Sequence, residues 1–143
     1  MPGNDVLHVV AAIFVQDNRV LACRRAPHKS SPGLWEFPGG KVDLGEGSFA
    51  ALEREIKEEL NLTCEAVKRF DISDTALAEQ VIRLETIVCV LANNPNLSSS
   101  DHDQFLWCEQ GQLQSLDWAS PDLPAVGKLR SLPSLDGLPE GHF

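Results

Sequence analysis

Residues 39–62 have the sequence GGKVDLGEGSFAALEREIKEELNL, and the rest of the chain is organised around this stretch. It begins with a glycine-rich turn and continues without proline from Gly47 to about Leu60. Its apolar side chains recur at spacings of three and four residues, which is the pattern of an amphipathic helix. These residues are Phe49, Leu52, Ile56 and Leu60. We therefore predict a helix over residues 47–60, with Gly47 or Ser48 as its N-cap.

Three glutamates of this predicted helix, Glu55, Glu58 and Glu59, lie within roughly 100° of one another on a helical wheel, beside the apolar stripe. Like charges one turn apart repel by roughly 0.2 to 0.5 kcal/mol per pair in water, and by more where water is excluded. Arg54 and Lys57 are predicted to point into other sectors of the wheel. A bound divalent cation is therefore the predicted neutralising group, and oxygen ligands suit Mg²⁺ or Mn²⁺.

The spacing around these glutamates supports a metal site over a merely solvated acidic face, which is the usual explanation for a charge run. Gly40 is followed after five residues by Glu46 and, after seven more, by REIKEELNL, residues 54–62. This pattern resembles the motif of the Nudix family, Gly-x5-Glu-x7-Arg-Glu-apolar-x-Glu-Glu-x-Gly-apolar, and eight of its nine positions match. Asn61 replaces the last glycine. Asparagine is the next-best residue for the left-handed conformation expected at a helix C-terminus.

The resemblance implies an α/β fold, in which a mixed, curved sheet lies between helices as an α/β/α sandwich. It also implies a Mg²⁺-dependent hydrolase of phosphoanhydride bonds, with Mn²⁺ as a second suitable ion. Within the family the chain is most similar to the mutator-type, or MutT-like, nucleoside triphosphate pyrophosphohydrolases of nucleotide-pool sanitation. The expected substrate is an oxidised dGTP or a cytidine triphosphate such as 5-methyl-dCTP, and the sequence does not choose between them.

The metal ligands implied by the resemblance are the carbonyl of Gly39 and the carboxylates of Glu55, Glu58 and Glu59. Arg54 is expected to orient these carboxylates through charge-assisted hydrogen bonds.

Asp101 is a further candidate, because family members carry an acidic residue six positions before a tryptophan, here Trp107, at the start of the last strand. It would complete the metal cluster or assist the general base, although His102 and Asp103 compete for this role and a plain loop carboxylate is an equal alternative. The base itself stays open among Glu55, Glu58 and Asp101.

Substrate contacts are also implied by the resemblance. Arg25, at the end of a predicted strand, and Lys41 are the expected phosphate-binding residues. Asp122 lies in the segment that contacts the base in the relatives, and Phe37 and Trp118 are candidates to stack on or wall the base. An ionised aspartate only accepts hydrogen bonds, which favours a base edge that donates them.

Composition agrees with a small nucleotide as the partner. The 143 residues fit one domain, residues 1–143, with one core. A net charge of −9 argues against polymeric nucleic acid or an anionic membrane as a standing partner. The four cysteines form no C-x-x-C pair, which favours reduced, buried thiols. The apolar run 6–15 is too short to span a bilayer, so we expect a cytoplasmic protein. The sequence makes no prediction of oligomeric state.

Apolar runs bounded by turn residues predict further elements. Strands are expected at residues 6–15, 20–23, 64–72 and 81–91, with a short strand and turn at 34–41. Loops are expected at 26–33, 73–80 and 92–100, a short helix at 109–116 and a last helix ending near Arg130. The tail, residues 131–143, is predicted to be frayed.

Three alternative functions are weaker. A catalytically silent Nudix-like sensor of a nucleotide would usually have a damaged motif and an attached effector domain. An acidic calcium-binding protein would need a D-x-D-x-D-G loop, which the sequence lacks. A Nudix hydrolase acting on another nucleoside diphosphate linked to a different group is the remaining alternative within the enzyme class.

Overall fold

The computed structural model describes residues 5–141, which form one mixed sheet with helices on both faces. In chain order the elements are β1 (Asp5–Gln16), β2 (Arg19–Arg25), β3 (Trp35–Glu36), β4 (Gly39–Lys41), α1 (Ser48–Leu60), β5 (Cys64–Ala76), β6 (Gln80–Leu91), β7 (His102–Glu109), the 3₁₀ helices η1 (Gln110–Ser115) and η2 (Ser120–Asp122), and α2 (Leu123–Ser131). The sheet order is β3-β2-β1-β6-β5, with β4 paired to β1 and β7 paired to β2.

The central strand β1 explains why the first apolar run has no polar face. It pairs in parallel with β6 from Asp5 to Phe14 and antiparallel with β2 and β4. A strand with neighbours on both sides and helices on both faces is buried on both faces, and Val10–Val15 are all buried. Alternate residues then serve two different cores, because successive side chains point to opposite faces.

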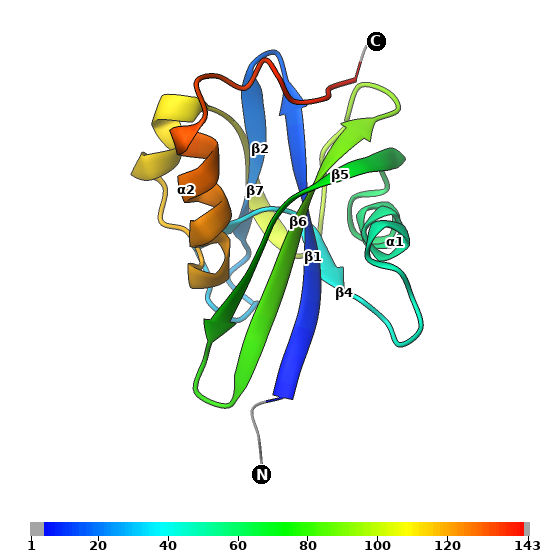
Figure 1. Ribbon diagram of the computed structural model, residues 1–143, viewed down its shortest axis with the longest axis vertical. Helices are drawn as coiled ribbons and strands as arrows, with labels where there is room; N and C mark the ends of the chain where they lie inside the picture. The colour runs from blue at the N-terminus through cyan, green and yellow to red at the C-terminus, as the bar shows by residue number, and fades with distance from the viewer. Residues whose placement is uncertain (1–4, 142–143) are drawn as a thin grey trace.

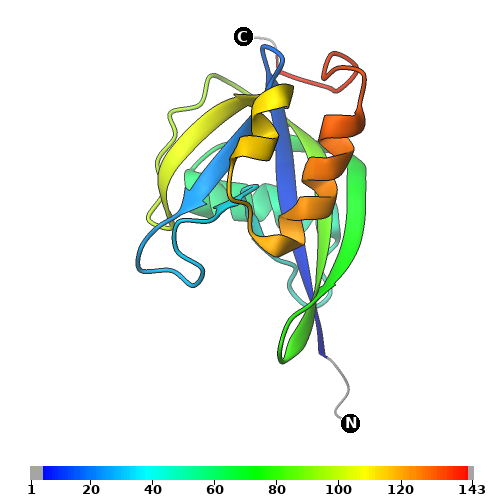
Figure 2. The same cartoon turned by 90° about the vertical axis from the view of Figure 1, so that its left-hand side faces the viewer.

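The two cores lie on opposite faces of the sheet. Val10, Ala12 and Phe14 pack with the buried face of α1. Ala11, Ile13 and Val15 pack with α2 and the segment after it. Figure 1 shows α1 and α2 on opposite sides of the strands, and Figure 2 shows α2 in front of the sheet with α1 behind it. The expected α/β/α sandwich with a mixed sheet is confirmed.

Helix α1 begins and ends where the sequence predicts. Gly47 is the N-cap, and Asn61 is the C-cap in the left-handed conformation with φ 54°. The apolar stripe differs at one position, because Phe49 is 37% exposed while Ala51 is buried with the other three predicted residues. The buried stripe therefore begins at Ala51, two residues later than the periodicity predicts.

Two predictions about mobile segments were wrong. β5 continues to Ala76 and β6 begins at Gln80, so most of the predicted loop 73–80 is paired strand. The tail was predicted to be frayed, but Leu135 is fully buried and Gln16 Nε2 donates a hydrogen bond to the Gly141 carbonyl (3.1 Å). Residues 142–143 of that predicted tail lie outside the described part.

Smaller differences concern the C-terminal helices and the cysteines. The short helix predicted at 109–116 is the 3₁₀ helix η1, and the last helix is α2. All four cysteines lie in strands as free thiols, and Cys23, Cys89 and Cys108 are buried. Among residues 5–141, no helix combines the length and the hydropathy needed to cross a bilayer.

Candidate active site

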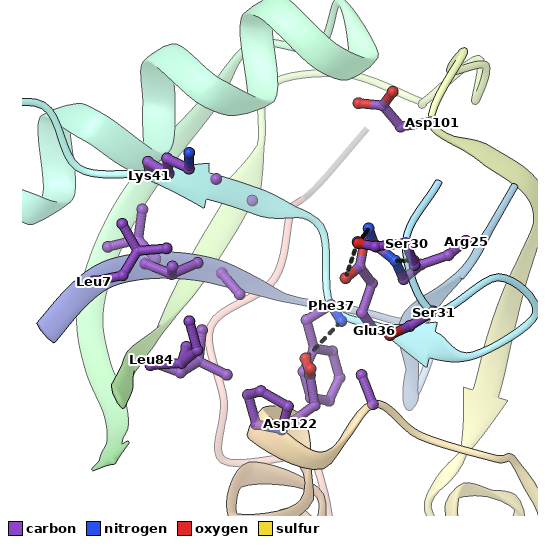
Figure 3. A pocket seen from close by; sticks show the side chains of 18 of the residues that line it. Leu7, Arg25, Ser30, Ser31, Glu36, Phe37, Lys41, Leu84, Asp101 and Asp122 are labelled. Atoms are coloured by element: carbon purple, nitrogen blue, oxygen red, sulfur yellow. Dashed lines mark hydrogen bonds and ion pairs between the residues drawn. The ribbon is translucent and has the colours of Figure 1, made fainter. Parts of the chain in front are cut away.

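A cavity of about 680 Å³ opens between α1, β4 and the loops that precede β3, β7 and α2. Its charged lining residues are Arg25, Lys29, Glu36, Lys41, Asp43, Glu55, Glu59, Asp101 and Asp122. One wall is apolar and is formed by Leu7, Val9, Ile82 and Leu84. Figure 3 shows Lys41 and Asp101 on the side nearer α1, with Asp122 on the opposite side next to Phe37. The cavity therefore has an acidic end at α1 and a mostly apolar end around Asp122.

The glycines of β4 let the backbone approach the acidic helix closely. A Cβ atom at Gly39 would overlap the carbonyl oxygen of Val10, and one at Gly40 would overlap the carboxylate of Glu55. The Gly39 clash is with main-chain atoms, so only glycine fits there, whereas a side chain at Gly40 would displace the end of the Glu55 side chain. The Glu55 carboxylate is thereby held directly against the main chain of β4.

Arg54 lies at the centre of the acidic end instead of in a separate sector of the helix, so that prediction was wrong. Its guanidinium donates to both oxygens of Glu46 (2.7 and 2.8 Å), to Glu55 Oε1 (2.9 Å) and to Glu58 Oε2 (3.0 Å). It also donates to the Lys41 carbonyl (3.1 Å). The hydrogen bonds from Arg54 are the main cause that lowers the pKa of Glu46 to about 2. Arg54 thus orients the glutamates of the motif and offsets their repulsion.

Glu59 is held from the other side by a buried histidine. His102 Nδ1 lies 3.0 Å from Glu59 Oε1, and its Nε2 lies 2.8 Å from Glu36 Oε2. Glu36 Oε1 in turn accepts a hydrogen bond from Arg25 Nη1 (3.0 Å). The His102 side chain is 1% exposed. Burial alone would lower its pKa, but the hydrogen bonds and charges of Glu36 and Glu59 outweigh burial and raise the pKa to about 9.

This chain of four side chains, Arg25–Glu36–His102–Glu59, is the part of the site that the sequence analysis missed. His102 was considered there as a competitor of Asp101, and Glu36 was not considered. The available sign that Glu36 belongs to the site was its position as a charged residue between two aromatic residues, Trp35 and Phe37, which are both buried. The partners come together because β2 pairs with both β3 and β7, which places Arg25 opposite His102 and Cys23 opposite Glu36.

The predicted metal ligands do not all converge. Gly39, Glu55, Glu59 and Asp101 line the cavity, whereas the Glu58 side chain is 58% exposed and turned to Arg54. Within residues 5–141, no group of three His, Cys, Asp or Glu side chains is arranged to hold an ion. The carboxylate and carbonyl oxygens at this end nevertheless match the ligands that hard divalent cations prefer. Arg54 and His102 lie against these glutamates and offset part of their negative charge.

Of the three competing candidates, Asp101 is the one that lines the cavity. Its Oδ1 lies 3.4 Å from Lys29 Nζ, and its carbonyl accepts a hydrogen bond from the Ala26 amide (2.9 Å). His102 belongs to the buried chain described above. Asp103 forms an exposed ion pair with Arg24 Nε (2.7 Å).

Arg25 and Lys41, the predicted phosphate-binding residues, both line the cavity. Arg25 is held by Glu36 and by the backbone and hydroxyl oxygens of Ser30. Lys41 is exposed at the end of β4. Their side chains flank the acidic end from two directions in Figure 3.

At the apolar end, Asp122 is buried, and its Oδ1 accepts a hydrogen bond from the Phe37 amide (3.0 Å). Burial is the main cause that raises the pKa of Asp122 to about 8. This shift favours the protonated carboxyl at neutral pH, whereas the sequence analysis assumed an ionised, purely accepting aspartate. Phe37 lines the cavity, whereas Trp118 packs behind it, with ring centroids 4.8 Å apart.

Asp122→Asn is expected to stabilise the fold, and more so near pH 8 than near pH 5. The folded chain holds the Asp122 proton up to about pH 8, whereas the unfolded chain releases it near about pH 3.9. The unfolded state therefore binds fewer protons in this window, and wild-type stability falls as the pH rises through it. Asparagine keeps the acceptor for the Phe37 amide and does not titrate.

Urea unfolding of wild type and variant in a chelator, near pH 5 and near pH 8, measures this difference. The gain should rise by a few kcal/mol between the two pH values. A gain of equal size at both would show that Asp122 is already ionised in the folded protein.

The chain is similar to several known proteins. The family model described as NUDIX domain matches residues 6–129. A CTP pyrophosphohydrolase of Escherichia coli K12 is 28% identical over 127 residues, covering 89% of this chain and 93% of that protein. A putative 8-oxo-dGTP diphosphatase 2 of Mycobacterium tuberculosis is 33% identical over 122 residues, covering 80% and 81%. The solution structure of the E. coli ORF135 protein superposes with a TM-score of 0.78 at 26% identity, covering 92% and 94%.

Proposed function

Because the chain belongs to the Nudix family and is a Nudix hydrolase, we propose that it converts a nucleoside triphosphate to the nucleoside monophosphate and pyrophosphate. Nudix hydrolases generally need a divalent metal ion, and Mg²⁺ is the ion we propose, with Mn²⁺ as a substitute. Two relatives support a nucleotide-pool substrate, since they are named for CTP and for 8-oxo-dGTP. We propose a cytidine triphosphate or an oxidised dGTP as the substrate.

The observation that carries this proposal is the division of the cavity into two chemically different ends. Oxygen ligands from Glu55, Glu59 and Asp101 line the end at α1, and Asp122 with the apolar wall lines the other. A nucleotide has the same division, because its phosphates attract cations and its base is a flat, largely apolar ring with a polar edge. Arg25 and Lys41 lie at the acidic end, where the phosphates would be.

The proposed reaction is a hydrolytic substitution at phosphorus. A water oxygen bonds to one phosphorus, the bridging P–O bond breaks, and its electron pair leaves with the departing phosphate group. The water proton passes to a carboxylate at the acidic end, which is Glu55, Glu58 or Asp101.

A divalent ion held by the glutamates and the Gly39 carbonyl would supply Lewis acidity and neutralise phosphate charge. Arg25 and Lys41 bind phosphate oxygens, and Arg54 keeps Glu55 and Glu58 in position.

Base recognition is proposed to depend on the proton of Asp122. A neutral carboxyl both donates and accepts, so it complements an edge with an adjacent acceptor and donor, such as N3 and N4 of cytosine. Guanine presents the same combination at O6 and N1. The neutral acid therefore matches either proposed base, and Phe37 supplies an apolar wall beside it.

The test is a substrate panel with Mg²⁺: the eight common (d)NTPs, 8-oxo-dGTP and 5-methyl-dCTP, with product identification. Release of pyrophosphate and monophosphate from a cytidine or oxidised guanosine triphosphate is expected. Turnover of nucleoside diphosphate sugars or dinucleoside polyphosphates with no triphosphate activity would overturn the proposal. Repeating the assay with a chelator checks the metal requirement.

A further inference from the structure

Lys29 and Asp101 form an ion pair that joins two loops across the mouth of the cavity. Lys29 lies in the loop between β2 and β3, and Asp101 precedes β7. The Lys29 Nζ and Asp101 Oδ1 atoms are 3.4 Å apart, and both residues line the cavity. Their side chains are 34% and 38% exposed, so the pair faces solvent and the cavity at once.

Two arginines near the acidic end have shorter contacts than Lys29. Arg25 has a hydrogen-bonded pair with Glu36 (3.0 Å) and further bonds to Ser30. Arg54 is held by Glu46, Glu55 and Glu58 at 2.7 to 3.0 Å. The Lys29–Asp101 contact is longer than these, and the Lys29 side chain is more exposed (34%) than those of Arg25 (19%) and Arg54 (29%). A ligand can therefore replace it more readily than these shorter contacts of the two arginines.

The exchange of partners costs little free energy. Ion pairs between exposed side chains contribute little to the stability of a protein. The terminal phosphate of a nucleotide carries more negative charge than one carboxylate, and a charge-assisted hydrogen bond to it is stronger than a neutral one. Lysine suits such a site because its ammonium group is a compact charge on a flexible side chain.

The geometry of the cavity places Lys29 at the phosphate end. Asp122, beside Phe37, lies on the opposite side of the cavity from Asp101 in Figure 3. A nucleotide whose base contacts Asp122 extends its phosphates towards α1 and Asp101. Because Lys29 contacts Asp101, its ammonium group lies where the phosphates farthest from the base would arrive.

We propose that Lys29 is a specificity-determining residue. It breaks its ion pair with Asp101 and binds the terminal phosphate of the nucleoside triphosphate instead. The proposal rests on the triphosphate hydrolysis proposed above and goes beyond it, because it predicts a preference for triphosphates over diphosphates. The same exchange releases the Asp101 carboxylate into the cavity only when a triphosphate is bound.

The experiment compares Lys29→Met and Lys29→Arg with wild type, and uses Lys57→Met as the control on the exposed face of α1. The kcat and KM values are measured with Mg²⁺ for dCTP against dCDP and for 8-oxo-dGTP against 8-oxo-dGDP. Pyrophosphate affinity is measured by calorimetry, which needs no turnover.

Lys29→Met should lower kcat/KM for the triphosphates about 10- to 100-fold, chiefly through KM, and change the diphosphate values less than about twofold. Pyrophosphate affinity should fall about tenfold, Lys29→Arg should recover part of both losses, and Lys57→Met should resemble wild type. An unchanged ratio of triphosphate to diphosphate activity together with unchanged pyrophosphate affinity would overturn the assignment.

The two proposals fail in different ways. A wild type that hydrolyses no triphosphate would refute the proposed function, and the calorimetry would still decide whether Lys29 binds phosphate. An active wild type whose selectivity does not depend on Lys29 would refute the Lys29 assignment alone.

Discussion

Glu58→Gln is expected to preserve the fold and to lower kcat by about a hundredfold or more. The side chain is 58% exposed, and the amide oxygen of glutamine can still accept the hydrogen bond from Arg54. Stability should therefore change by less than about 0.5 kcal/mol, as for most surface substitutions. What the variant loses is one negative charge at the acidic end, where cation binding and water activation depend on the same few carboxylates.

Three measurements define this result. Steady-state kinetics at saturating Mg²⁺ gives kcat, urea unfolding gives stability, and calorimetry with Mn²⁺ gives metal affinity. Glu79→Gln, an exposed glutamate in the β5–β6 turn, is the matched control and should behave as wild type. Near-normal turnover of Glu58→Gln in Mg²⁺ would refute the assignment of this residue.

Local sequence pattern was sufficient to predict the helix that carries the motif. The apolar spacing, the glycine before the helix and Asn61 after it determine where α1 begins and ends, because these are preferences of a few neighbouring residues. The same local reasoning failed for residues 73–80. Those residues have turn composition, but β5 and β6 extend into them, and Asp74 pairs with Arg83 across the two strands.

The residues of the site were predictable one by one, but their partners were not. A helical wheel gives the direction of a Cβ atom, whereas the long Arg54 side chain turns back over Glu55 and Glu58. The contact of His102 with Glu36 and Glu59 depends on strand register far along the chain. No spacing within one segment reports such a contact.

The buried histidine gives the second large effect. His102→Leu is expected to lower the free energy of unfolding by about 3 kcal/mol at neutral pH in a chelator. Without the imidazolium, the carboxylates of Glu36 and Glu59, which are 21% and 14% exposed, would face each other across an apolar side chain. Removing His102 leaves Glu59 without this partner, whereas Glu36 keeps its pair with Arg25. Breaking a buried charge pair in this way costs far more than losing an exposed pair.

Urea unfolding measures this loss, with Asp74→Asn as the control. Asp74 pairs with Arg83, and both side chains are nearly half exposed, so that substitution should cost less than about 1 kcal/mol. Adding Glu59→Gln to His102→Leu should recover part of the stability, because the repulsion disappears with the charge. If His102→Leu cost no more than the control, Glu36 and Glu59 would not depend on the histidine for neutralisation.

Mg²⁺ should also restore more stability to His102→Leu than it adds to wild type, since a cation bound at Glu59 would replace the missing charge.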